Sequence, residues 1–198
     1  MFENAPLITH RAPRPDGYKP FWHRHEEMPE DYFAALKDIP AFFDNDSFNS
    51  YCRQVIECWP SDMLSGAATE PLHAELSSKI LDGGHGVIPT DWGGVVIERH
   101  EHPHVEKYLV VNRGGYLAFE THAEKIEHLE VREGKGVLLF RPEDQEQIVA
   151  QLIQPGFEIL LKPGQEHCLI GIENLVVFEK SDDFKGMDQD LIFIFEPS

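Results

Sequence analysis

The chain has 198 residues, of which 41% are hydrophobic, so it can bury one large core or two smaller ones. Its formal net charge of −18 argues against nucleic acids and anionic membrane surfaces as partners, because both bind clustered Lys and Arg. The chain has no run near the roughly 18 apolar residues of a membrane span, and its three cysteines form no CxxC motif, which argues against a disulfide framework or a thiolate zinc site.

The first part of the chain, residues 1–28, is rich in Pro, His and aromatic residues and predicts an irregular arm. It has no basic region followed by an apolar core, so no secretory signal is expected, and a cytoplasmic location follows. His23 and His25 lie in this arm. An isolated pair in a loop lacks the supporting shell that metal ligands need, so a surface position is favoured.

The next stretch, residues 29–83, has the apolar spacing of helices. Three helices are expected: one after Pro29 that ends before Pro40, one capped by Asp46 or Ser47 that runs through Cys58, and one from Thr69 to Leu81. Glycines at 83 and 84 end the last of these. We therefore expect residues 1–88 to form a helical N-terminal extension.

After Gly83 and Gly84 the spacing of apolar residues changes from the 3.6-residue period of helices to the 2-residue period of strands. Ten short segments are strand-like: 95–98, 107–111, 115–121, 127–132, 136–140, 147–152, 157–162, 167–170, 174–179 and 191–195. Gly or Pro turns separate many of them, which indicates an all-β sandwich or barrel over residues 89–198.

A group of polar residues interrupts two of these strands. Glu120 and His122 are two residues apart and share one face of a strand, and Glu127 lies on the apolar face of the next strand. Two carboxylates and an imidazole on an inner face destabilise a core unless something satisfies them. A divalent metal would do so, and His167, three residues after a Pro-Gly turn, is the candidate fourth ligand.

The spacing of these residues resembles the two motifs of the cupin superfamily, and two registers compete for the first motif. Residues 114–134 fit every spacing but place Glu120 where the motif has its first His. The other register uses His100, His102 and Glu106, with a closing glycine one residue late. In that reading these three residues would form the metal site with His167.

We prefer the first register because the sequence around it resembles the cupin domain of type II phosphomannose isomerases and the C-terminal domain of GDP-mannose pyrophosphorylases. Trp92-Gly93 matches the opening of that domain, and the block from Leu117 to Leu129 aligns without a gap. In this block Glu120 falls on the family's Gln, His122 on its His, Lys125 on its Arg and Glu127 on its Glu. Residues 160–167 match the second motif, and the resemblance covers about residues 91–196.

The resemblance implies a mainly β cupin barrel, a double-stranded β-helix, with a divalent metal held by Glu120, His122, Glu127 and His167. Zn²⁺, Mn²⁺, Fe²⁺ and Ni²⁺ suit this ligand set. The implied activity is sugar isomerisation on a small-molecule substrate, in which the metal polarises a carbonyl and a base moves a proton. The candidate catalytic residues, which lie near the motifs, are Lys125, Glu124 and Glu166.

The family's C-terminal basic signature is replaced by residues 189–195, so a neutral sugar or a sugar acid is expected rather than a phosphosugar. Cupins are commonly homodimers, which the resemblance extends to this chain. Two other functions stay open: a non-haem iron dioxygenase that uses the same ligands, and a non-catalytic module that binds carbohydrate without need of the metal.

Overall fold

The structure is a computed structural model that describes residues 10–11, 28–60, 70–143, 145, 147–186 and 188–198. His23 and His25, which are expected at the surface, lie outside these residues. The described helices include none that is long and apolar enough to span a membrane.

The three expected helices are present as α1 (Glu30–Lys37), α2 (Asn45–Glu57) and α3 (Pro71–Asp82). Helix α2 begins earlier than expected, because Asp44 rather than Asp46 or Ser47 is its cap. The Asp44 carboxylate accepts from the Ser47 backbone N–H at 2.8 Å, and the Ser47 hydroxyl accepts from the Asp44 N–H at 3.0 Å. This reciprocal pair satisfies two backbone donors at the helix start. Gly83, with φ of 64°, ends α3 in the left-handed conformation that suits glycine.

Each of the ten strand-like segments overlaps a strand, and two further short strands are present among the described residues. The bounds are β1 His10–Arg11, β2 Val87–Thr90, β3 Gly93–Glu101, β4 His104–Val111, β5 Phe119–His122, β6 Ile126–Glu133, β7 Gly136–Phe140, β8 Val149–Ile153, β9 Glu158–Leu161, β10 His167–Gly171, β11 Leu175–Asp182 and β12 Leu191–Phe195.

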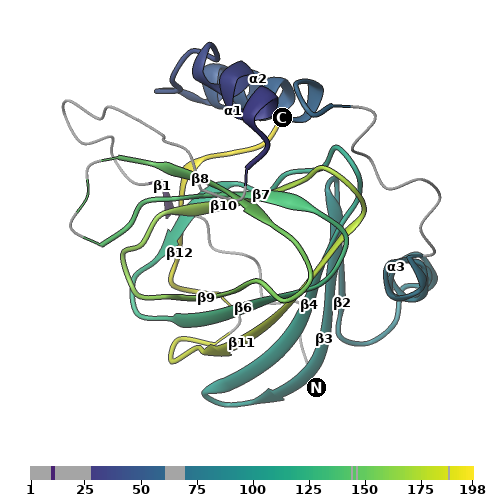
Figure 1. The fold of residues 1–198 in the computed structure, drawn as a ribbon. Coiled ribbons are helices and arrows are strands. Elements are labelled where there is room, and N and C mark those ends of the chain that lie inside the picture. The colour runs from purple at the N-terminus through teal and green to yellow at the C-terminus, as the bar shows by residue number, and fades with distance from the viewer. Residues whose placement is uncertain (1–9, 12–27, 61–69, 144, 146, 187) are drawn as a thin grey trace.

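The strands form two six-stranded sheets with the orders β2-β3-β4-β11-β6-β9 and β1-β12-β5-β10-β7-β8. We call them the β4 sheet and the β5 sheet. The eight strands β4 to β11 form two groups of four neighbouring strands. The order is β4-β11-β6-β9 in the β4 sheet and β5-β10-β7-β8 in the β5 sheet. This is the strand order of a jelly roll, the architecture of cupins. The predicted mainly β cupin barrel with a helical N-terminal part is therefore confirmed (Figure 1).

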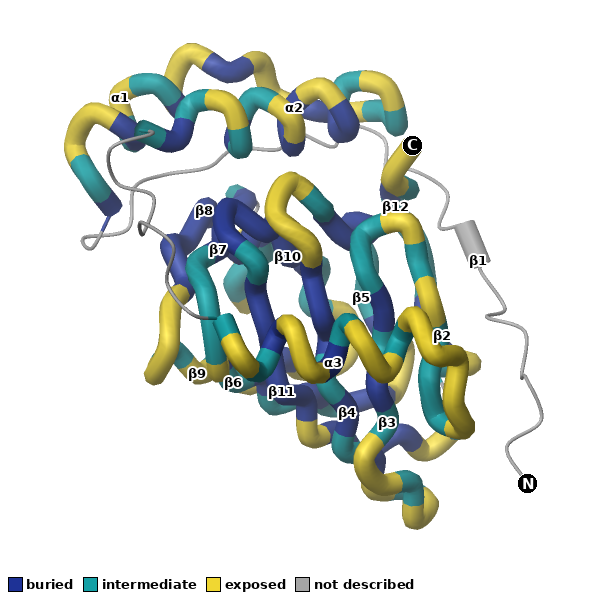
Figure 2. Tube along the Cα trace, turned by 90° about the vertical axis from the view of Figure 1, so that its right-hand side faces the viewer, coloured by how far each residue is buried: buried dark blue, intermediate teal, exposed yellow. Residues whose placement is uncertain are grey.

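Apolar side chains line the inside of the barrel and also cover the outside of both sheets. Leu138 packs inside, whereas its neighbours Val137 and Leu139 face the cluster under α1 and α2. Because both faces of β7 are covered, this strand is apolar throughout. Figure 2 shows α1 and α2 on the side of the barrel where β7, β8 and β10 lie. The ring of Phe42 contacts Phe119 of β5 at 5.5 Å between centroids.

Helix α3 packs on the outside of the β4 sheet, where Leu76 meets Val96, Val110 and Val176. Strand β2 runs across the expected boundary between residues 88 and 89 and pairs with β3. The helices thus share clusters of buried side chains with both sheets. The division into two parts at residue 88 stays a prediction.

Candidate active site

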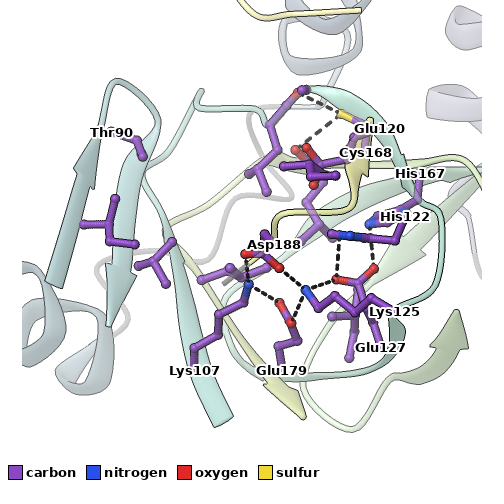
Figure 3. Close-up of a pocket in the computed structure, with 18 of the residues that line it drawn as sticks. Thr90, Lys107, Glu120, His122, Lys125, Glu127, His167, Cys168, Glu179 and Asp188 are labelled. Carbon is purple, nitrogen blue, oxygen red and sulfur yellow. Dashed lines mark hydrogen bonds and ion pairs between the residues drawn. The ribbon is translucent and has the colours of Figure 1, made fainter. Parts of the chain in front are cut away.

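A cavity of about 370 Å³ lies inside the barrel between the two sheets. Its walls are mostly apolar, with Trp92, Leu129 and Phe193 among them. Polar side chains gather at one end, as Figure 3 shows: Lys107, Glu120, His122, Lys125, Glu127, His167, Glu179 and Asp188. All four predicted metal ligands therefore line the same cavity.

Strand pairing explains why residues far apart in the chain meet here. His167 of β10 lies directly opposite Glu120 of β5, and His122 is two residues further along β5. Glu127 comes from β6 in the facing sheet. Its two carboxylate oxygens lie 3.4 Å from the Nε2 atoms of His122 and His167, respectively. One buried carboxylate thus faces both imidazoles.

The other ring nitrogen of each histidine has an acceptor. His122 Nδ1 lies 2.8 Å from the Asp190 carboxylate, and His167 Nδ1 lies 3.3 Å from the backbone carbonyl of Gln165. In the tautomer with the ring hydrogen on Nδ1, each histidine would donate to its acceptor and leave Nε2 free to bind a metal ion. Histidines that ligate metals are oriented in this way by an acceptor behind the ring.

The protonation states agree with the needs of a metal site. Burial lowers the pKa of His167, so this ring is neutral at pH 7. Burial acts to raise the pKa of Glu127, but Lys125, together with His122 and His167 once these rings are protonated in acid, outweighs it and lowers that pKa from 4.5 to about 2. For His122, Glu127 and Asp190 outweigh burial and raise the pKa. A metal would release the proton of a charged His122.

Among the described residues, no three His, Cys, Asp or Glu side chains are already arranged as a metal-binding group. The donor chemistry nevertheless fits: the Nε2 atoms of two imidazoles and one ionised carboxylate converge within the barrel. Glu120 shares this wall, but burial raises its pKa from 4.5 to about 8, so it is largely protonated at pH 7. A metal that used Glu120 would have to displace that proton.

Two buried lysines form an ion-pair network beside the candidate ligands. Lys125 is only 1% exposed, and its Nζ lies 2.9 Å from Glu127, 2.7 Å from Glu179 and 2.6 Å from Asp188. Lys107 Nζ lies 2.7 Å from Asp188 and 3.3 Å from Glu179. Lys125 is therefore in the cavity, as the sequence predicts, but it already binds three carboxylates.

The other two candidate catalytic residues lie elsewhere. Glu124 is half exposed and pairs with Lys185 at 3.0 Å. Glu166 pairs with Arg141 at 2.8 Å. Neither side chain lines the cavity, so their positions lend no support to the predicted catalytic role.

The competing register lies in the hairpin between β3 and β4. His102 is exposed near its turn, and His104 pairs with Asp182 at 2.6 Å. His100, His102 and Glu106 do not line the cavity that holds His167. The arrangement therefore favours the register with Glu120, His122 and Glu127.

Sequence reasoning missed Lys107, Glu179, Asp188 and Asp190. The first two left a signal: Lys107 lies between the inward residues Val105 and Leu109, and Glu179 follows the inward Val177 by two positions. Asp188 and Asp190 come from the segment between β11 and the start of β12, where no period marks an inward side chain.

No family model and no curated protein matches the chain. Solved structures with a similar fold include the capsular polysaccharide assembling protein CapF from Staphylococcus aureus, at 18% identity over 55% of this chain and 34% of that chain, with a TM-score of 0.46. A second CapF structure covers 83% of this chain and 45% of that chain at 15% identity, with a TM-score of 0.48. KdgF from Halomonas sp. matches 50% of this chain and 82% of its own at 16% identity, with a TM-score of 0.39. The chain spans less than half the length of these CapF chains.

Proposed function

We propose that this protein is a metal-dependent cupin enzyme of the sugar-isomerase type that acts on a small carbohydrate or sugar acid. The observation that carries the proposal is the contact of one buried carboxylate, Glu127, with the Nε2 atoms of two histidines at 3.4 Å each. His122, Glu127 and His167 would hold a Zn²⁺, Mn²⁺, Fe²⁺ or Ni²⁺ ion, with Glu120 as the fourth ligand. The resemblance to type II phosphomannose isomerases belongs to this proposal.

A bound metal would supply Lewis acidity that polarises a substrate carbonyl. The protein's own residues shape the site around it. Asp190 binds His122 Nδ1 and so orients the ring with Nε2 toward the cavity. Lys125 binds the Glu127 carboxylate and positions it beside the two imidazoles. The side chains of His122, Lys125, Glu127 and His167 are buried, and this low exposure strengthens each of these charge interactions.

The proposal is tested on the intact protein. Metal content is measured after purification, after treatment with a chelator, and after return of each of the four metals. Interconversion of aldoses and ketoses is followed by NMR over a panel of neutral sugars and sugar acids. We expect one metal per chain, loss of turnover on chelation and recovery with one of the four ions. Turnover that persists without metal, or a chain that binds none of these ions, overturns the proposal.

One observation favours a second function, that of a non-haem iron dioxygenase. Among the described residues, the ion-pair distances between predicted ligands join His122, Glu127 and His167 but not Glu120. Two histidines with one carboxylate are the ligands of such enzymes. Oxygen uptake by the Fe²⁺-loaded protein would support this function. Sugar binding that is unchanged by metal removal would instead support a non-catalytic carbohydrate-binding module.

Loss of the Asp190 carboxylate is expected to weaken metal binding. Asp190 accepts from His122 Nδ1 and from the backbone N–H groups of Glu124 and Lys125, at 2.8, 2.7 and 2.8 Å. Asp190→Ala should therefore free the His122 ring and raise the metal Kd by roughly 10–100-fold. Calorimetric titration measures this change. Asp182→Ala removes the exposed carboxylate that pairs with His104 and serves as the control. Equal Kd values in both variants would contradict the role of Asp190.

A further inference from the structure

The charged groups at the polar end of the cavity are already paired with one another. Lys107 and Lys125 both contact Glu179 and Asp188, at distances from 2.6 to 3.3 Å, so two ammonium groups and two carboxylates form a closed set of four. Lys125 also binds Glu127. Figure 3 shows these side chains turned toward one another. Neither lysine has a charge left over for an anionic ligand.

The described residues that line the cavity offer no spare positive charge. No Arg, and no Lys besides these two, is among them. Leaving aside Glu120, and Glu196, which has interactions of its own, the carboxylates among them are Glu127, Glu179, Asp183 and Asp188. Four negative charges against two positive ones leave an excess of two, which one divalent metal would balance.

From this balance we infer that the cavity selects a neutral sugar over carboxylated or phosphorylated counterparts of the same sugar. The inference rests on the proposed function and decides between its two substrate classes. An anion that entered would add a charge that no lysine of the described lining is free to balance, or would have to separate a lysine from its buried carboxylates, which leaves those carboxylates unpaired. Hydroxyl and carbonyl groups can instead hydrogen-bond to the polar end while the ring packs on the apolar walls.

The test uses three ligands that share one ring and differ at one carbon: D-glucose, D-glucuronate and the glucose phosphate ester at that carbon. Their Kd values for the metal-loaded protein are measured by calorimetry or by competition. The wild-type protein should bind D-glucose at least about tenfold more tightly than either anion, a difference of about 1.4 kcal/mol. Equal or tighter binding of D-glucuronate overturns the inference.

Two variants release positive charge in the network without touching a predicted metal ligand. Asp188→Asn keeps the backbone strain low, since Asp188 has φ of 58° and Asn tolerates this conformation. Glu179→Gln makes the same charge change from β11, so the test survives if one variant fails to fold. Each should improve the affinity for D-glucuronate relative to D-glucose by about tenfold. Asp182→Asn, the same change at an exposed position outside the cavity, should leave the ratio as in the wild type.

The metal content of every preparation separates the two levels of the proposal. A wild-type protein that binds its metal yet prefers D-glucuronate overturns the charge selection alone. A protein that binds none of the four metals overturns the proposed function, whichever ligand it prefers.

Discussion

Replacing Lys125 with methionine should lower the free energy of unfolding by about 3–5 kcal/mol, the usual cost of removing one partner from a buried ion pair. Methionine keeps much of the side-chain volume but not the charge. Glu179 and Asp188 would then share the single remaining ammonium group of Lys107, and the Glu127 carboxylate would lose its contact with Lys125. Urea unfolding at pH 7 measures the change.

The matched control is Lys185→Met. Lys185 pairs with Glu124 at 3.0 Å, but both side chains are about half exposed, at 52% and 50%. Exposed pairs of this kind contribute about 0–1 kcal/mol, so the control should unfold close to the wild type. The double variant with Lys125→Met and Glu127→Gln should recover part of the lost stability, since it removes one of the stranded carboxylates. Equal losses for the two single lysine variants would show that the network is not buried in solution.

The effect of Lys125→Met should also depend on pH. The pKa of Glu127 is lowered from 4.5 to about 2 in the fold, so its ion pairs stabilise the protein fully above about pH 4.5, and this contribution is lost as the pH falls toward 2. In the variant the same carboxylate loses its nearest positive charge and takes up a proton at higher pH. The stability difference between wild type and variant should therefore be largest near pH 7 and shrink in acid.

The barrel was predictable because its signals are local. Alternation along β6, and the glycine turns between strands, identify strands without knowledge of their partners. Strand β2 was missed, since Val87–Thr90 is short and carries a proline. The start of α2 was placed too late because Asp44 and Asp46 are equally good caps. Only the reciprocal bond between Asp44 and Ser47 decides between them.

The convergence of His122, Glu127 and His167 was also predictable, because motif spacing fixes which strand faces carry them. The balance of charge around them was not. Lys107 and Glu179 occupy inward positions of the paired strands β4 and β11, two residues from inward apolar residues, so their burial could have been noticed. Asp188 reaches both lysines only because the segment after β11 folds back with φ of 58° at this residue. No sequence period encodes that turn, so the network that neutralises the lysines came from the structure alone.

Replacing His122 with alanine should abolish stoichiometric metal binding, whereas His102→Ala should bind metal as the wild type does. His122 is buried, and its Nε2 atom faces a Glu127 oxygen at 3.4 Å, so the substitution removes one of the two imidazoles that would hold the ion. Loss of a direct ligand should raise the metal Kd by more than the roughly 10–100-fold that loss of an outer-shell partner costs. Competition with a chelator of known affinity measures both variants.

The pair of variants also decides between the two registers of the sequence motif. His102 is exposed in the β3–β4 hairpin, outside the cavity, so its replacement tests the alternative site without disturbing the barrel. His122→Ala leaves Asp190 buried without its imidazole partner, so its unfolding midpoint is measured as well. Metal bound by a folded His122→Ala protein, or lost from His102→Ala, would place the ion at the hairpin. Loss of metal from a folded His122→Ala protein alone would place the ion between the two sheets, where the Glu127 carboxylate lies 3.4 Å from the Nε2 atoms of both histidines.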